Sequence, residues 1–285
     1  MTVSFGQRLA DVFAASGRLC VGIDPHSYLL GEWDLPDTAA GVREFGLRVV
    51  EASHGRAGIV KPQVAFYERH GSAGYAALED VLAAARAAGL LVIADAKRGD
   101  VGTSVEAYGQ AWLTPGSPLE ADAMTISAFQ GTGSITAPRD LALAGGKGLF
   151  VLAATSNPEA AAVQTARLTA MSGKSGGGKS VAASIVEDVQ HWNRGAAPLG
   201  SVGVVIGATV DMGAYGIEPS MLSETPVLAP GFGHQGARLG DVTTLFGAAS
   251  AGVIVSSSRA VLGAGPQGIA AAIVAQNTEI AEAFA

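Results

Sequence analysis

Eight short apolar runs recur along the chain, separated by segments with helical periodicity. We predict strands at residues 19–24, 57–62, 90–95, 121–125, 149–154, 202–206, 226–229 and 252–255. Strands that alternate with helices are typical of a parallel α/β fold. Because polar side chains follow many of these runs, we expect a closed (β/α)8 TIM barrel, in which all strand ends meet at one face. A doubly wound open sheet, which would spread these ends along an edge, is the competing architecture.

The segments between the strands complete this pattern. We predict helices at residues 5–15, 38–53, 72–88, 103–112, 136–144, 180–192, 211–222, 241–248 and 268–284. The chain has 285 residues, enough for two average domains or one large barrel. No proline-rich or charge-rich linker divides it. We therefore expect residues 1–285 to form a single barrel domain that begins with an N-terminal helix.

Composition narrows the class of protein. The net charge of −7 and the pI near 5.2 argue against nucleic-acid binding, which needs a basic face. They leave room for a small anionic substrate, because a site can be locally positive in an acidic protein. The sequence predicts no membrane span and no signal peptide, since residues 1–16 lack a basic start and contain Asp11. The single cysteine, Cys20, predicts a buried strand residue and a cytoplasmic protein.

Charge is concentrated at the end of the third predicted strand. The apolar run 91–94 is followed by Asp95, Lys97 and Asp100, so two carboxylates flank one ammonium. Asp95 and Lys97 are two residues apart and should point to the same side of an extended strand. Such a lysine should stay charged and could stabilise and then protonate a carbanion, which suits decarboxylation or aldol-type cleavage. An ion-paired strand end that only holds a loop explains this motif equally well by itself.

Polar residues follow other strands of the predicted barrel, where they should reach the same rim. These residues are Asp24, Lys61, Thr125, Ser156, Gln235 and Arg259. We expect Thr125 to bind substrate there. Barrels often bind phosphate with the loops after strands seven and eight, so Gln235, Gly236 and Arg259 predict a phosphate cradle. The alternatives are an ordinary glycine-containing turn and a surface arginine at a helix start.

Four stretches together resemble one known family. The segment Asp95-Ala-Lys97-Arg-Gly-Asp100 resembles the D-x-K-x-x-D motif of orotidine 5′-phosphate decarboxylases. Residues 60–66, 154–158 and 230–236 resemble the longer, bacterial branch of that family, in the right order along the chain. The resemblance implies a (β/α)8 homodimer without metal or organic cofactor. It also implies the conversion of orotidine 5′-phosphate to uridine 5′-phosphate and carbon dioxide, in pyrimidine biosynthesis.

The same resemblance implies a role for each matching residue. Lys97 would protonate pyrimidine C6, Asp95 would lie against the substrate carboxylate, and Lys61 would bridge Asp95 and the ribose. Asp100 and Ser104 would complete the neighbouring site across the dimer. The other implied substrate contacts are Asp24 to a ribose hydroxyl, Ser156 to the pyrimidine edge, and Gln235 and Arg259 to the phosphate.

Three other functions fit parts of the sequence. A magnesium-dependent phosphosugar lyase or aldolase shares the D-x-K-x-x-D element but would want a carboxylate where Lys61 stands. Residues 173–180 match the phosphate-loop pattern of ATPases, yet no strand is predicted immediately before them. We interpret residues 172–180 as a flexible, basic loop after the fifth strand. A phosphate-binding barrel without catalytic activity is the third alternative.

Overall fold

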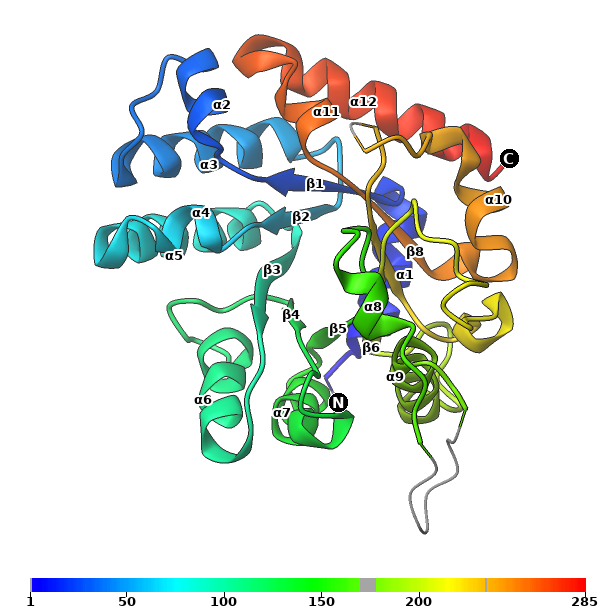
Figure 1. Ribbon diagram of the computed structural model, residues 1–285. Helices are drawn as coiled ribbons and strands as arrows, with labels where there is room; N and C mark the ends of the chain where they lie inside the picture. The colour runs from blue at the N-terminus through cyan, green and yellow to red at the C-terminus, as the bar shows by residue number, and fades with distance from the viewer. Residues whose placement is uncertain (1, 170–177, 234) are drawn as a thin grey trace.

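One closed barrel of eight parallel strands organises the chain (Figure 1). The computed structural model describes residues 2–169, 178–233 and 235–285. The strands follow one another in sequence order around the barrel, and β8 pairs with β1. They are β1 Leu19–Ile23, β2 Ile59–Pro62, β3 Leu91–Arg98, β4 Ala123–Ile126, β5 Gly148–Ala154, β6 Val202–Ile206, β7 Val227–Pro230 and β8 Val253–Ser257. The TIM-barrel prediction is confirmed, and the open sheet is excluded.

Helices cover the outside of this barrel (Figure 1). The long helices lie where periodicity predicts them, within one to three residues at each end. The α-helices are α1 Phe5–Ser16, α2 Ser27–Glu32, α3 Ala39–Ser53, α4 Ala65–Glu68, α5 Gly71–Ala87, α6 Gly102–Leu113, α7 Thr136–Ala144, α8 Ala160–Gln164, α9 Val181–Trp192, α10 Val242–Phe246, α11 Arg259–Leu262 and α12 Gly265–Ala283. The 3-10 helices are η1 Thr132–Ile135, η2 Pro219–Leu222, η3 Leu239–Asp241 and η4 Gly247–Gly252.

Two helix predictions are wrong or too long. The predicted helix 211–222 is a series of turns that ends in η2. The Asp211 carboxylate accepts hydrogen bonds from the backbone N–H groups of residues 213 and 214, and Gly216 has φ +70°. Both features favour turns over helix. The predicted helix 241–248 is shorter, because Gly247 (φ +50°) ends α10 after Phe246.

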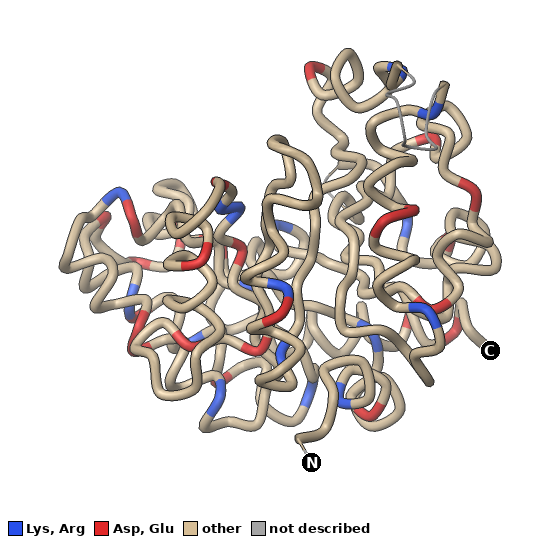
Figure 2. Tube along the Cα trace, turned by 90° about the horizontal axis from the view of Figure 1, so that it is seen from below, with Lys and Arg blue, Asp and Glu red and all other residues tan. Residues whose placement is uncertain are grey.

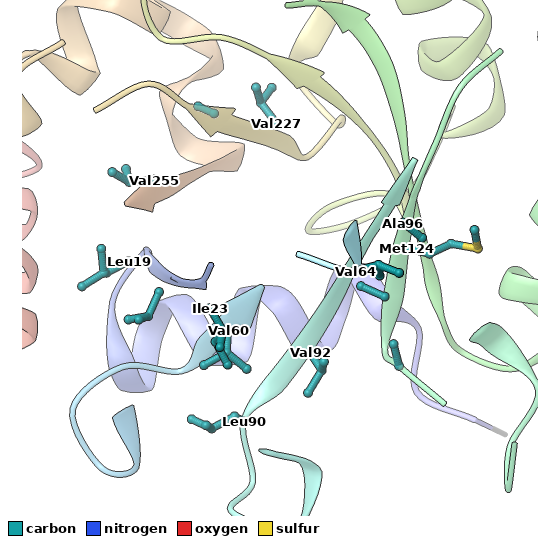
Figure 3. Packing of buried hydrophobic residues seen from close by; sticks show 14 of the residues in the cluster. Leu19, Ile23, Val60, Val64, Leu90, Val92, Ala96, Met124, Val227 and Val255 are labelled. Atoms are coloured by element: carbon teal, nitrogen blue, oxygen red, sulfur yellow. The ribbon is translucent and has the colours of Figure 1, made fainter. Parts of the chain in front are cut away.

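The strands are packed on both faces, which explains why they are continuous apolar runs in the sequence. Residues such as Val60, Val92 and Val255 join the cluster that lies between strands and helices (Figure 3). Cys20, Ile59 and other residues form a second cluster with Phe5 and Leu9 of α1. Phe5 packs edge-to-face on Phe150 with ring centroids 5.8 Å apart. The N-terminal helix therefore supplies part of the core inside the barrel.

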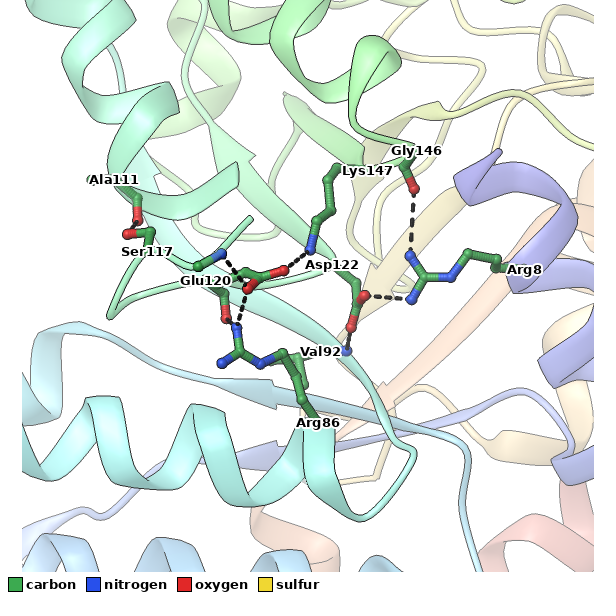
Figure 4. Close-up of polar contacts among 10 residues, drawn as sticks. Arg8, Arg86, Val92, Ala111, Ser117, Glu120, Asp122, Gly146 and Lys147 are labelled. Carbon is green, nitrogen blue, oxygen red and sulfur yellow. Dashed lines mark hydrogen bonds and ion pairs between the residues drawn. The ribbon is translucent and has the colours of Figure 1, made fainter. Parts of the chain in front are cut away.

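An ion-pair network holds α1 against the strand starts (Figure 4). Arg8 of α1 pairs with the buried carboxylate of Asp122, which also accepts a hydrogen bond from the Val92 N–H at 2.9 Å. Beside it, Glu120 pairs with Lys147 at 2.7 Å and with Arg86 at 3.0 Å. These contacts lie at the opposite end of β3 from its charged motif. We therefore assign them to the stability of the barrel and not to the charged site.

Charged residues of both signs are interspersed along the rest of the chain, as the view from below shows (Figure 2). Several of them pair on the surface, for example Arg43 with Asp80 at 2.6 Å. Among the described residues, no helix combines the length and the apolarity that crossing a bilayer requires.

Candidate active site

A cavity of about 590 Å³ opens at the carboxyl ends of the strands, where barrel enzymes carry their active sites. Its walls come from the carboxyl-terminal parts of β2, β3, β7 and β8 and from the segments that follow β1, β2, β7 and β8. The lining residues are Asp24, His26, Lys61, Gln63, Ala65, Phe66, Asp95, Lys97, Pro230, Gly231, Phe232, Gln235, Ser256, Ser258 and Arg259. The barrel thus brings together the charged ends of strands one, two, three and eight at one cavity.

Asp95 is the centre of the polar contacts in this cavity. Its Oδ2 accepts hydrogen bonds from Lys61 Nζ at 3.1 Å and from Gln63 Nε2 at 2.8 Å. Its Oδ1 lies 2.7 Å from Lys97 Nζ and accepts a hydrogen bond from Thr125 Oγ1 at 2.8 Å. Burial alone would raise the pKa of Asp95, but the two lysines outweigh it and hold that pKa well below its usual range. The carboxylate is therefore fixed in position and negatively charged.

Lys61 is a buried cation with 5% of its surface exposed. Burial acts to lower the pKa of Lys61, but the negative charges of Asp95 and Asp24 outweigh this effect, so the pKa lies above its ordinary value. The neutral amine that a Schiff base requires is therefore not accessible at Lys61 near neutral pH.

The backbone of β3 departs from a regular strand at Lys97. The sequence predicts a regular strand, whereas Lys97 has φ +47°, a left-handed conformation that is uncommon outside glycine. Its N–H donates to Thr125 Oγ1 at 2.9 Å, and the pairing of β3 with β4 shifts register between Ala94 and Arg98. The side chain remains 47% exposed and lines the cavity. The two side chains meet as predicted, and the ammonium also faces the space where a ligand would lie.

Two predicted members of the site lie elsewhere in the chain's own fold. Within the described residues, Lys97 forms an ion pair with Asp95 and none with Asp100, so a single chain supplies one of the two carboxylates that flank Lys97 in the sequence. Asp100 Oδ1 accepts a hydrogen bond from the Val101 N–H at 2.8 Å instead. Ser104 is exposed on α6. Neither residue lines the chain's own cavity.

Thr125 also differs from its prediction as a substrate contact. It is buried behind Asp95 and is absent from the cavity lining. Its hydroxyl accepts from the Lys97 N–H and donates to the Asp95 carboxylate. One side chain therefore sets the positions of both charged groups.

Asp24 presents an unsatisfied oxygen. Its Oδ1 is buried and has no hydrogen-bond partner among the described residues, although the residue lines the cavity. A buried acceptor without a donor is unfavourable by about 1–3 kcal/mol. A hydroxyl group of a bound molecule would supply the missing donor.

The phosphate cradle is assembled in part. Arg259 is the first residue of α11 and lines the cavity without an ion pair to any described carboxylate. Gln235 also lines the cavity, and its Oε1 lies 3.5 Å from Ser156 Oγ. Gly236, with φ +107°, is outside the lining, and its N–H donates to the Gly233 carbonyl at 3.0 Å. The structure thus brings Gln235 and Arg259 together and leaves Ser156 and Gly236 at the edge.

Sequence reasoning missed the polar cavity residues Ser256 and Ser258, and also His26 and Gln63. His26 and Gln63 each stand two residues after a predicted charged position, Asp24 and Lys61 respectively. Asp95 and Lys97 are also two residues apart. Applying the same spacing beyond the prolines at positions 25 and 62 would have predicted both His26 and Gln63 as cavity residues.

The structure also bears on nucleophilic and metal chemistry. Cys20 is fully buried in β1, and burial raises the pKa of its thiol to about 12, which excludes a reactive thiolate near neutral pH. Within residues 2–169, 178–233 and 235–285, no group of three or more His, Cys, Asp or Glu side chains could hold a metal ion.

Most of the phosphate-loop match lies outside the described residues, which omit 170–177. Its last three residues, Gly178, Lys179 and Ser180, are described. Lys179 pairs with Glu187 at 2.5 Å, and the Ser180 hydroxyl caps α9 by accepting from the Ala183 N–H. The element before the loop is the helix α8, whereas a phosphate loop follows a strand.

Comparisons with known proteins match this chain to one family. A family model described as the Orotidine 5′-phosphate decarboxylase / HUMPS family matches residues 17–273. The orotidine 5′-phosphate decarboxylase of Salinispora arenicola (strain CNS-205) is 48% identical over 263 residues, covering 92% of this chain and 91% of that protein.

Solved structures are similar over the whole barrel. The crystal structure of a candidate orotidine 5′-phosphate decarboxylase from Streptomyces avermitilis is 44% identical, with a TM-score of 0.92, and covers 99% of this chain and 96% of that one. The Leishmania donovani OMP decarboxylase is 29% identical, with a TM-score of 0.74, and covers 99% and 100% of the two chains. With its matching family model and close relatives, the chain belongs to the orotidine 5′-phosphate decarboxylase / HUMPS family.

Proposed function

We propose that the protein is a carboxy-lyase that converts orotidine 5′-phosphate to uridine 5′-phosphate and carbon dioxide, a step of pyrimidine biosynthesis. The observation that carries this proposal is the array Lys61–Asp95–Lys97, which faces a cavity that also contains Arg259. The family description covers a second activity class, but relatives 46–49% identical over nine-tenths of the chain are named orotidine 5′-phosphate decarboxylases. Lys61 stands where the magnesium-dependent alternative would want a carboxylate.

The proposed reaction needs only a fixed cation and a proton. The bond between C6 and the carboxylate breaks, and its electron pair stays on C6 as carbon dioxide leaves. The Lys97 ammonium stabilises this carbanion and then donates a proton to C6, which leaves a neutral amine that solvent reprotonates. Each tenfold gain in rate requires about 1.4 kcal/mol of transition-state stabilisation. A charge that is already in position before the reaction is well suited to supply it.

Asp95 keeps that charge in position. Three donors, Lys61, Gln63 and Thr125, hold the carboxylate in one orientation. The carboxylate in turn holds Lys97 Nζ at 2.7 Å, and it would face the substrate carboxylate. We propose that no metal or organic cofactor takes part, because the proton and the positive charge both come from the lysine side chain.

The remaining residues would bind the nucleotide. Asp24, with its unsatisfied Oδ1, and Lys61 would contact the ribose hydroxyls. Gln235 and Arg259 would bind the phosphate, with the backbone near Gly236 at the edge of this subsite. Ser156, 3.5 Å from Gln235, would hydrogen-bond the pyrimidine edge. Thr125 would act as a positioning residue through Asp95.

A homodimer would bring Asp100 and Ser104 to the partner's cavity. Apolar side chains lie exposed near these residues: Val101 is 53% exposed, Tyr108 on α6 37%, and Phe129, after β4, 82%. A second copy of the chain would cover them, and apolar burial favours association. We place the dimer in the cytoplasm, because its buried free thiol needs no oxidising compartment.

The dimer can be tested by subunit complementation. The variants Lys97→Ala and Asp100→Ala should each be nearly inactive alone. After mixing and exchange of subunits, some dimers would combine an intact Lys97 and an intact Asp100 at one site, and activity should return. No recovery after verified exchange would contradict the shared site.

The reaction itself is tested by the loss of orotidine 5′-phosphate absorbance with purified protein in excess chelator. The wild-type protein should turn over, and Lys97→Ala should lose most turnover while it still binds uridine 5′-phosphate. The matched control is Lys179→Ala, which removes a lysine of the phosphate-loop match whose side chain is 42% exposed, and it should leave turnover unchanged. Activity that disappears in chelator, or survives in Lys97→Ala, would refute the proposed mechanism.

A further inference from the structure

His26 is a polar residue of the cavity to which the proposed reaction assigns no role. It follows β1 by three residues and lines the same cavity as Asp24 and Arg259. Its backbone is fixed on both sides, because its N–H donates to the Asp24 carbonyl at 2.7 Å and its carbonyl accepts from the Leu30 N–H at 3.0 Å. The residue therefore has little freedom to leave the wall.

Aromatic contacts also fix the ring. The imidazole packs against Phe66, with centroids 4.3 Å apart and planes at 60°, and against Tyr28, with centroids 5.4 Å apart and planes at 30°. These contacts hold the ring in the wall of the cavity. Among the described residues, neither ring nitrogen has a hydrogen-bond partner. A polar edge without a partner in a ligand cavity suggests a ligand contact.

The charge of the ring follows from its surroundings. Burial lowers the pKa of His26, Asp24 acts in the opposite direction, and Arg259 and Arg69 lower the pKa further. The ring is therefore neutral near neutral pH and presents one N–H donor and one acceptor. A neutral donor can stand near the Arg259 guanidinium without repulsion, and both can face one anion.

Resting on the proposed function, we propose that His26 is a specificity-determining residue whose ring N–H donates a hydrogen bond to the 5′-phosphate held by Arg259. It would select the nucleotide over the phosphate-free nucleoside. The neighbouring Asp24 has an unsatisfied acceptor for a ribose hydroxyl. Asp24 would therefore contact the ribose, and His26 would contact the phosphate.

The substitution His26→Phe tests this role, because it keeps an aromatic ring against Phe66 and Tyr28 and removes the N–H. Uridine 5′-phosphate and uridine are the two probes, titrated by calorimetry at one pH and one salt concentration. A hydrogen bond to a charged group corresponds to about a tenfold or larger loss of affinity. We expect that loss for uridine 5′-phosphate and an unchanged Kd for uridine. KM for orotidine 5′-phosphate should rise similarly, with kcat nearly unchanged.

The control is Tyr28→Phe, which removes an exposed hydroxyl outside the cavity lining and should leave both affinities unchanged. Equal losses for the two probes would mean a ribose contact or a damaged wall, and would overturn the proposal. Unchanged binding of uridine 5′-phosphate, or a loss confined to kcat, would overturn it as well. A wild-type protein without turnover would refute the proposed function, while the comparison of the two probes would still decide the role of His26.

Discussion

The substitution Asp95→Asn would keep the shape of the side chain and remove its charge, which leaves the buried Lys61 ammonium without its partner. The two groups lie 3.1 Å apart, and both side chains are less than 10% exposed. At an effective dielectric constant of 20, unit charges at this distance attract by about 5 kcal/mol. In the native protein most of this attraction offsets the cost of burying both ions. In the variant the attraction is gone, and the cost of burying Lys61 remains.

Removing one partner of a buried ion pair typically lowers the free energy of unfolding by about 3–5 kcal/mol. Lys97 adds little to this figure, because its ammonium is half exposed and water can solvate it. We therefore expect Asp95→Asn to lower the free energy of unfolding by about 3 kcal/mol at pH 7. For a chain of 285 residues the entropy of unfolding is about 0.6 kcal/mol/K, so that loss corresponds to a decrease in Tm of about 5 °C.

The loss should depend on pH in a defined direction. The pKa of Asp95 is depressed in the folded protein, so its contribution is present above the unfolded pKa of about 3.9. It is lost as the pH falls through the folded value. The difference between wild type and variant should therefore be constant from about pH 5 to 7 and should narrow below about pH 4.

Urea unfolding at fixed protein concentration and several pH values measures this difference. The control is Asp37→Asn, which breaks a pair with Arg69 whose side chains are 40% and 34% exposed. It should cost less than about 1 kcal/mol. A variant at position 95 that is no less stable than this control would refute the reasoning. So would a difference that persists unchanged at low pH.

Three further results are expected. Arg8→Met keeps the apolar stem but leaves Asp122 without its cation, so urea unfolding should show a loss of about 2 kcal/mol with turnover unchanged; an equally stable variant would contradict this. In Gly99→Ala the new Cβ would lie 2.4 Å from the Ser127 carbonyl oxygen, and the displaced loop should lower kcat about tenfold or more, which initial rates would detect. Cys20 should resist Ellman's reagent in the folded protein and react in urea, whereas rapid labelling under native conditions would disprove its burial.

The strands could be predicted because a parallel barrel buries both faces of every strand. The run 202–206 is apolar throughout and is the whole of β6. The segment 211–222 is predicted as a helix, yet it forms turns. Local chemistry decides otherwise there, since Asp211 caps a turn and Gly216 adopts a left-handed conformation. Short-range hydrogen bonds of this kind compete with a helix and leave little trace in periodicity.

The site was predictable at the level of strand ends and less so at the level of individual contacts. The sequence spacing placed Asp95 beside Lys97 but gave no sign of the left-handed backbone at Lys97. That conformation depends on Thr125, which is 28 residues away and accepts from the Lys97 N–H. The direction of Asp100 depends in turn on the close approach of Gly99 to the β4 end. Contacts between distant segments determine both features, so no local pattern could predict them.

The unsatisfied groups of the cavity favour a ligand-binding cluster over an ion-paired strand end that only holds a loop. Asp95 by itself fits either interpretation, because four donors satisfy it. A purely structural cluster would neutralise its other members too. Here Lys97 stays half exposed, Asp24 Oδ1 is buried without a donor, and Arg259 has no carboxylate partner among the described residues, although all three line one cavity. Unsatisfied groups cost stability in the free protein, and an anion with ribose hydroxyls would satisfy them together.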